Sequence, residues 1–135
     1  MIGRVLDSSA LLAWGRRTSP FVDAMVWSRA QHSGYVVPLV TTAPALAAAL
    51  AQLNEPAVPV LDALLSMEIS IVDELTPSCA PGVAVILRAA GPYAAEQVTA
   101  ASIVRTAKRR GLPVVTANPF PLRALASDVE IDLIP

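Results

Sequence analysis

The sequence of 135 residues lacks most of the residue patterns that define common catalytic and disulfide-stabilised folds. Its single cysteine, Cys79, excludes an internal disulfide, and its single histidine, His32, has no serine or cysteine partner at a suggestive spacing. No zinc-ligand spacing, glycine-rich phosphate loop or nucleophile elbow is present. The N-terminus also lacks the basic start and apolar stretch of a secretory signal, so we expect a cytoplasmic protein.

Long hydrophobic runs are also missing, although the composition is 54% hydrophobic and the mean hydropathy is +0.55. No apolar window reaches the roughly 18 residues that span a bilayer. The alanine-rich stretch "APALAAALAQL" (Ala43–Leu53) is too short and is typical of a buried helix. We therefore expect no membrane association, one domain over residues 1–135, and a homodimer formed through apolar helices.

Charge of either sign is scarce, because the net charge is −1 and only 16% of residues are charged. This balance gives no general attraction to nucleic acid, so RNA binding would need a local basic patch. "KRR" (Lys108–Arg110) could contact phosphate. Three cations at the end of a predicted helix are more simply explained as a solvated end that matches the helix dipole.

Apolar strand patterns alternate with helix patterns along the whole chain. The predicted strands are Ile2–Leu6, Tyr35–Val40, Glu68–Asp73, Val114–Thr116 and Val129–Ile134. The predicted helices are Ala10–Arg16, Pro20–Gly34, Thr42–Asn54, Pro56–Ser66, Pro77–Ala90, Tyr93–Arg110 and Pro119–Ala126. This alternation predicts an α/β protein, a three-layer α/β/α sandwich around a mostly parallel sheet of four to five strands.

Several polar side chains are predicted to meet at one edge of this sheet. Asp7 follows the first strand and Asn118 follows the fourth, and ligand sites form beyond the carboxyl ends of parallel strands. The helix predicted over residues 93–110 runs antiparallel to the strands, so its N-terminus, with Glu96 and Gln97, points to the same edge.

Each of these side chains also has a purely structural interpretation. Asp7 could cap the following helix, although Ser8 or Ser9 could do so unaided. Glu96 would be favoured near a helix N-terminus by the dipole, and Asn118 is a common residue in a turn before proline.

The motifs around these positions resemble those of PIN-domain nucleases. "VLDSSALLAW" (Val5–Trp14) is similar to the family's first motif, a strand that ends in an aspartate before an apolar helix. Residues Ala94–Leu125 resemble its C-terminal half, and Val36–Leu50 lies where the family has a second, helix-borne acid. The resemblance spans nearly the whole chain and implies a fold like that of the toxin nucleases of bacterial toxin–antitoxin pairs.

The resemblance implies a site in which three or four carboxylates hold Mg²⁺ or Mn²⁺ and a metal-activated water hydrolyses RNA. Asp7 matches the first acid and would be the metal ligand. The second acid falls near Ala43 or Pro44, neither of which can bind a cation through its side chain. The third falls at about Gln97, one residue from Glu96, and the fourth falls at Asn118, a neutral isostere of aspartate.

We therefore expect a degenerate PIN-domain protein with lost or weak nuclease activity, which binds RNA or a protein partner such as an antitoxin. One alternative is an active Mg²⁺- or Mn²⁺-dependent endoribonuclease that uses Asp7, Glu96 and Asn118 as catalytic residues. Ser8 and Thr116 are predicted to contact the substrate. Another alternative is a structural interaction module with no cofactor and no ligand at the edge beside Asp7.

Overall fold

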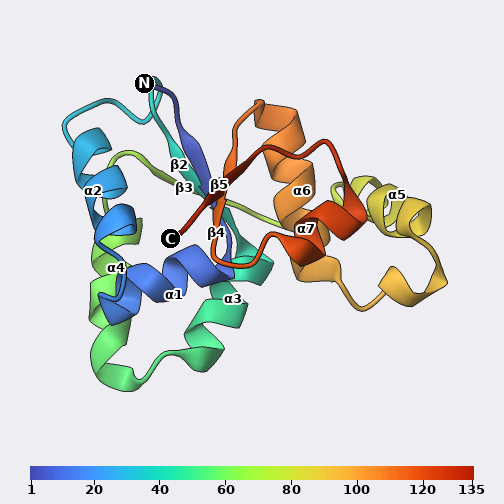
Figure 1. Ribbon diagram of the computed structural model, residues 1–135, viewed down its shortest axis with the longest axis horizontal. Helices are drawn as coiled ribbons and strands as arrows, with labels where there is room; N and C mark the ends of the chain where they lie inside the picture. The colour runs from blue at the N-terminus through green and yellow to red at the C-terminus, as the bar shows by residue number, and fades with distance from the viewer.

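The computed structural model describes the backbone of residues 1–135 and every side chain except that of Tyr93. Its centre is a five-stranded sheet in the order β3-β2-β1-β4-β5, in which all neighbouring pairs are parallel (Figure 1). The strands are β1 (Arg4–Leu6), β2 (Leu39–Thr42), β3 (Ser70–Asp73), β4 (Val114–Thr116) and β5 (Ile131–Leu133). The strand that precedes Asp7 therefore lies in the middle of the sheet.

Helices cover both faces of the sheet, with α1, α2 and α4 on one side of Figure 1 and α5, α6 and α7 on the other. The helices are α1 (Ser8–Arg16), α2 (Pro20–Arg29), α3 (Ala43–Gln52), α4 (Val58–Leu65), α5 (Ala80–Ala90), α6 (Val98–Arg110) and α7 (Phe120–Leu125). Two short 3₁₀ helices, η1 (Glu55–Ala57) and η2 (Pro92–Ala94), precede α4 and α6. The predicted three-layer sandwich with a parallel sheet is confirmed.

The period-two alternation of the strands divides the core into two clusters. Leu6 and Val115 belong to the cluster beneath α1, α2 and α4, whereas Val5 and Val114 belong to the cluster beneath α6 and α7. Neighbouring residues of one strand point to opposite faces, so a strand that is apolar throughout must be covered on both sides. The buried face of α6 contributes Ile103 and Ala107 to the second cluster.

Some predicted boundaries are wrong. The strand predicted over Tyr35–Val40 begins only at Leu39, because the N–H groups of residues 36 and 37 bond to the carbonyl of Ser33 in a turn. The helix predicted to reach Gly34 ends at Arg29. The helix predicted from Tyr93 begins at Val98, since η2 and a further turn come first.

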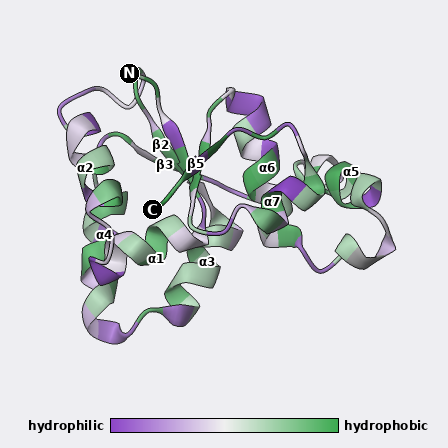
Figure 2. Ribbon diagram, viewed as in Figure 1, coloured by the Kyte–Doolittle hydropathy of each residue, from purple (hydrophilic) through white to green (hydrophobic). Residues whose placement is uncertain are grey.

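The predicted basic end of α6 lies in the hydrophilic segment at its C-terminus (Figure 2). Two of its three cations form ion pairs, Lys108 with Asp128 at 3.1 Å and Arg110 with Asp73 at 2.6 Å. These pairs support the structural interpretation of "KRR". Among the described residues, no helix is both long and apolar enough to cross a membrane.

Candidate functional site

Asp7 lies directly after β1 and is the N-cap residue of α1. Its backbone is extended, with φ −81° and ψ −177°, and its carboxylate Oδ1 accepts a hydrogen bond from the N–H of Ala10 at 3.0 Å. The capping interpretation of Asp7 is therefore confirmed, and the expectation that Ser8 or Ser9 caps this helix is wrong. Capping uses one carboxylate oxygen and leaves the other for a different role.

Ser9 connects Asp7 to the loop that follows β4. The Ser9 hydroxyl donates to Asp7 Oδ1 at 2.6 Å and accepts from the N–H of Ala117 at 2.9 Å. It also lies 3.3 Å from the hydroxyl of Thr116, which in turn accepts from the N–H of Asn118 at 3.0 Å. This chain of hydrogen bonds fixes the two strand ends relative to each other. Sequence reasoning missed it, although the paired serines after Asp7 were a usable signal.

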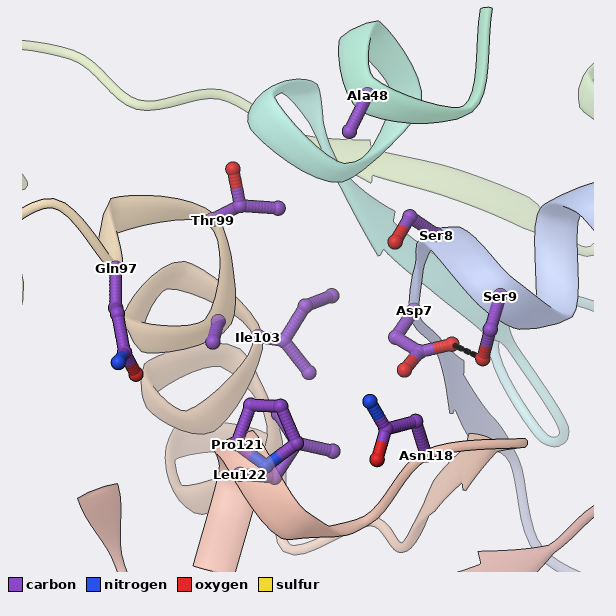
Figure 3. A pocket seen from close by; sticks show the side chains of 11 residues that line it. Asp7, Ser8, Ser9, Ala48, Gln97, Thr99, Ile103, Asn118, Pro121 and Leu122 are labelled. Carbon is purple, nitrogen blue, oxygen red and sulfur yellow. Dashed lines mark hydrogen bonds between the residues drawn. The ribbon is translucent and has the colours of Figure 1, made fainter. Parts of the chain in front are cut away.

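A cavity of about 460 Å³ opens beside Asp7, between α1, α3, α6 and α7 (Figure 3). Its lining combines a polar edge with an apolar wall. The lining residues are Asp7, Ser8, Ser9, Ala48, Gln97, Thr99, Ala100, Ile103, Asn118, Pro121 and Leu122. Asp7 is the only ionisable side chain in this set, so the cavity carries a single negative charge and no compensating cation.

Burial raises the pKa of the Asp7 carboxyl above its ordinary value. The hydroxyl groups of Ser9 and Thr116 and the N–H of Ala10 lower the pKa, but they do not offset the loss of hydration. All of these donors are neutral. The ionised form of Asp7 is therefore disfavoured in the folded protein and would be stabilised by a bound cation.

The structure brings some of the predicted site residues together. Ser8 and Asn118 line the cavity with Asp7, and Thr116 lies buried beneath them at the end of β4. Gln97 lines the far side, where it immediately precedes α6. Glu96 is exposed and is not among the residues that line the cavity. The catalytic and substrate-binding roles of these residues remain predictions.

The position of the second expected acid is occupied by small side chains. Ala43 and Pro44 lie in the first turn of α3, and Ala48 is the α3 residue that lines the cavity. Among the described residues, no group of three or more His, Cys, Asp or Glu side chains could hold a metal ion. One carboxylate with neighbouring amides does not fit the cage of three or four carboxylates that the resemblance implies.

A second carboxylate, Asp73, lies at the end of β3, outside the cavity. Arg110 donates from Nη2 to Asp73 Oδ1 at 2.6 Å, and Thr106 donates to Oδ2 at 3.0 Å. Burial tends to raise the pKa of Asp73, but the hydrogen bonds from Arg110 and Thr106 and the charge of Arg110 outweigh it and hold the pKa below the ordinary value. Both carboxylate oxygens of Asp73 therefore already accept hydrogen bonds within the fold.

The fold is similar to that of a solved bacterial toxin. VapC20 of Mycobacterium tuberculosis, a toxin that cleaves the sarcin-ricin loop, aligns with a TM-score of 0.65. The alignment covers 98% of this chain and 100% of VapC20 at 13% sequence identity. The resemblance to toxin-type PIN proteins is therefore confirmed for the architecture, a PIN-like α/β/α sandwich. No protein-family profile and no curated protein sequence matches this chain.

Proposed function

We propose that this chain is a cytoplasmic PIN-like protein that has lost most of its acidic site. It acts by binding RNA or a protein partner, and it does not cleave RNA. The observation that supports this most directly is the lining of the cavity, in which Asp7 is the only carboxylate among the described residues. The resemblance implies further acids near Ala43 or Pro44 and at Asn118, and of these positions only Asn118 lines the cavity, as an amide.

The chemistry of phosphodiester hydrolysis explains why one carboxylate is too few. Mg²⁺ and Mn²⁺ prefer oxygen ligands, and they must be held firmly beside the phosphate to activate water. Ser9 and the N–H of Ala10 both bond to Asp7 Oδ1, so Asp7 would offer a cation mainly its other oxygen. A cation held by that oxygen and by neutral amides would be bound weakly and positioned loosely.

A protein partner fits this site better than RNA does. Among the described residues, no Lys or Arg lines the cavity, so phosphate would meet the charge of Asp7 without compensation. Exposed apolar side chains lie elsewhere on the surface, including Val85 of α5 and Phe120 of α7, which are 59% and 78% exposed. Such side chains favour a protein interface, either in a homodimer or with an antitoxin-like partner.

An RNA cleavage assay tests the proposal. Wild-type protein and Asp7→Asn are incubated with structured RNA in millimolar Mg²⁺ and then in millimolar Mn²⁺. We expect no cleavage that depends on both the metal and Asp7. Metal-dependent cleavage by the wild type that disappears in Asp7→Asn would overturn the proposal, because it would show a working nuclease.

The second candidate is an active Mg²⁺- or Mn²⁺-dependent endoribonuclease that uses Asp7, Asn118 and Glu96. The observation in its favour is that Asp7 and Asn118 line one cavity at the carboxyl edge of the sheet. The same assay with Glu96→Gln tests the third residue, since an active enzyme of this kind would lose cleavage in that variant also.

A further inference from the structure

Arg29, the last residue of α2, is a buried cation without a carboxylate partner. Only 6% of the residue is exposed. Its Nε donates to the carbonyl of Ile2 at 3.0 Å, and its Nη1 donates to the carbonyl of Met25 at 3.1 Å and to the hydroxyl of Ser28 at 3.2 Å. All three acceptors are neutral, and among the described residues no ion pair includes Arg29. Buried arginines are rarely left without a counterion, because the lost hydration of the charge is then not offset.

The second terminal nitrogen of this guanidinium, Nη2, reaches the surface. Among the described residues, Nη2 of Arg29 makes no hydrogen bond. The fully buried side-chain oxygens and nitrogens without a partner in this part of the chain comprise Asp23 Oδ1 alone, so Nη2 is not fully buried. Two N–H donors of Arg29 are therefore available to a group that approaches from outside.

Arg4, the first residue of β1, adds a second positive charge nearby. Its Nη1 donates to the carbonyl of Gly3 at 3.0 Å, one residue after the Ile2 carbonyl that Arg29 contacts. Its Nε pairs with Asp132 of β5 at 2.8 Å. Burial and the charge of Arg4 hold the pKa of Arg29 below its ordinary value, and the charge of Asp132 offsets them only in part. Two cations here share one carboxylate, which leaves a positive charge uncompensated.

Exposed apolar side chains lie on the two chain segments beside this charge. The segment before β2 runs along the N-terminal segment, because the N–H of Arg4 donates to the carbonyl of Pro38 at 3.0 Å and Gly3 packs against Pro38 with no room for a Cβ atom. Both segments lie at the end of the sheet where the N-terminus is marked (Figure 1). The large apolar side chains exposed on them are Met1, Ile2, Tyr35 and Val36, and Tyr35 is 97% exposed.

The charge and the apolar side chains together indicate the class of partner. The phosphates of RNA would pair with a guanidinium, but three of the four exposed side chains are aliphatic and offer no aromatic face on which bases could stack. The carboxylate of an acidic side chain matches the planar guanidinium through charge-assisted hydrogen bonds. The apolar side chains of the same polypeptide would remove the exposed ones from water. Charge complementarity and exposed apolar area therefore favour an acidic polypeptide.

We propose that the amino edge of the sheet is a docking surface for a polypeptide partner, whose Asp or Glu carboxylate pairs with Arg29 Nη2 and whose apolar side chains cover Ile2 and Tyr35. This surface lies at the opposite end of the strands from the cavity beside Asp7. The inference goes beyond the proposed function, which concerns that cavity, and it does not depend on whether the cavity supports cleavage.

Titration with matched peptides tests the charge. The full-length protein is titrated with acetyl-Leu-Glu-Leu-amide and with acetyl-Leu-Gln-Leu-amide, which has nearly the same shape and no charge, while backbone amide signals are followed by NMR. We expect the Glu peptide to bind at least about fivefold more tightly, because only its carboxylate forms charge-assisted hydrogen bonds with the guanidinium. The signals of Ile2, Gly3 and Val36 should shift, whereas those of Ser8 and Ala48 at the cavity should not.

Three variants locate the interaction. Arg29→Gln removes the charge and keeps a donor for the carbonyl of Ile2, so it should abolish the preference for the Glu peptide. Arg123→Gln makes the same change in net charge at an exposed residue of α7 and should leave the preference unchanged. Asp132→Asn removes the carboxylate that pairs with Arg4, so it should increase the preference by at least about twofold. This last variant tests the charge of the site even if Arg29→Gln does not fold.

Equal affinity of the wild type for the two peptides would overturn the inference. So would a preference that survives in Arg29→Gln or that fails to rise in Asp132→Asn. Tighter binding of oligouridylate than of the Glu peptide, with shifts at the same signals, would assign the surface to nucleic acid and overturn the polypeptide assignment. None of these results would disturb the proposed function, which depends on the cleavage assay. Conversely, metal-dependent cleavage that requires Asp7 would overturn the proposed function and leave this docking surface in place.

Discussion

Asp7 and Asp73 stand at the carboxyl ends of two strands of the same sheet, yet they have opposite electrostatic environments. Asp73 accepts from Arg110 and Thr106, and its pKa lies below the ordinary value. Asp7 is half-buried among neutral donors, and the loss of hydration holds its pKa above the ordinary value. The cationic partner favours the ionised form of Asp73 in the folded protein, whereas neutral donors leave the ionised form of Asp7 disfavoured, so Asp7 would gain from a cationic ligand.

The largest effect should come from removing the paired carboxylate. Asp73→Ala leaves Arg110 and Thr106 without their acceptor, so the free energy of unfolding should fall by about 2 kcal/mol. Urea denaturation followed by circular dichroism measures this change. Asp128→Ala, which removes an exposed carboxylate paired with Lys108, is the matched control and should cost clearly less than Asp73→Ala. Equal losses in the two variants would contradict the role assigned to Asp73.

A smaller loss is expected for Ser9→Ala. The Ser9 hydroxyl bonds to Asp7 and to the N–H of Ala117, and therefore joins β1 to the loop after β4. Removing it should lower the free energy of unfolding by about 1 kcal/mol, because two partners lose a hydrogen bond. Ser8→Ala is the control. Ser8 is the neighbouring residue and lines the cavity. Among the described residues, its hydroxyl makes no hydrogen bond like those of Ser9. A larger loss in Ser8→Ala than in Ser9→Ala would refute this assignment.

Asp7→Asn should change stability in the opposite direction. The amide keeps an acceptor for Ala10 and no longer requires a buried charge, so the melting temperature at pH 7 should rise by a few degrees, on the order of 1 kcal/mol. Differential scanning calorimetry measures the shift. A fall of the melting temperature at pH 7 would show that the ionised carboxylate is stabilised in the folded protein by something other than the described contacts.

The pH dependence sharpens the contrast between the two aspartates. The pKa of Asp7 is raised on folding, so its ionisation costs stability as the pH rises from the unfolded value of 3.8 through the folded pKa. The pKa of Asp73 is lowered, so its contribution is complete above 3.8 and is lost as the pH falls through the folded pKa. We expect the gain in the free energy of unfolding that Asp7→Asn brings to shrink towards low pH. The loss in the free energy of unfolding that Asp73→Asn causes should also shrink towards low pH. Urea denaturation of the wild type and both variants between pH 3 and pH 7 checks this, and a gain in Asp7→Asn that grows on acidification would contradict it.

The sequence was sufficient to predict the architecture, because apolar strands and amphipathic helices alternate with distinct periods. It also predicted that Asp7 and Asn118 share one edge, because both follow parallel strands. Local turns were harder to predict. The apolar letters of Tyr35–Val37 resemble a strand, but these residues form a turn because their backbone groups bond to Ser33 and Pro38 follows.

The other features of the site depend on which elements pack against one another in the folded protein. The hydrophobic periodicity of the sequence does not contain that information. Ala48 is one of several alanines in α3, and only the packing of that helix beside α6 shows that it lines the cavity. The role of Ser9 depends on Ala117, which lies 108 positions away in sequence. Glu96 was expected at the start of a helix, and the later start of α6 leaves it exposed.

The most direct test of the central proposal, that Asp7 is the only acid among the described residues of this site, is a Mn²⁺ titration of thermal stability. A cation that binds only the folded protein raises its melting temperature. The wild type and Asp7→Asn should show no shift at millimolar Mn²⁺, whereas Ala48→Glu combined with Asn118→Asp, which supplies two further carboxylates to the cavity, should show a clear rise. A rise in the wild type that matches the rise in the double variant and disappears in Asp7→Asn would contradict the account, because it would show that the cation site is intact.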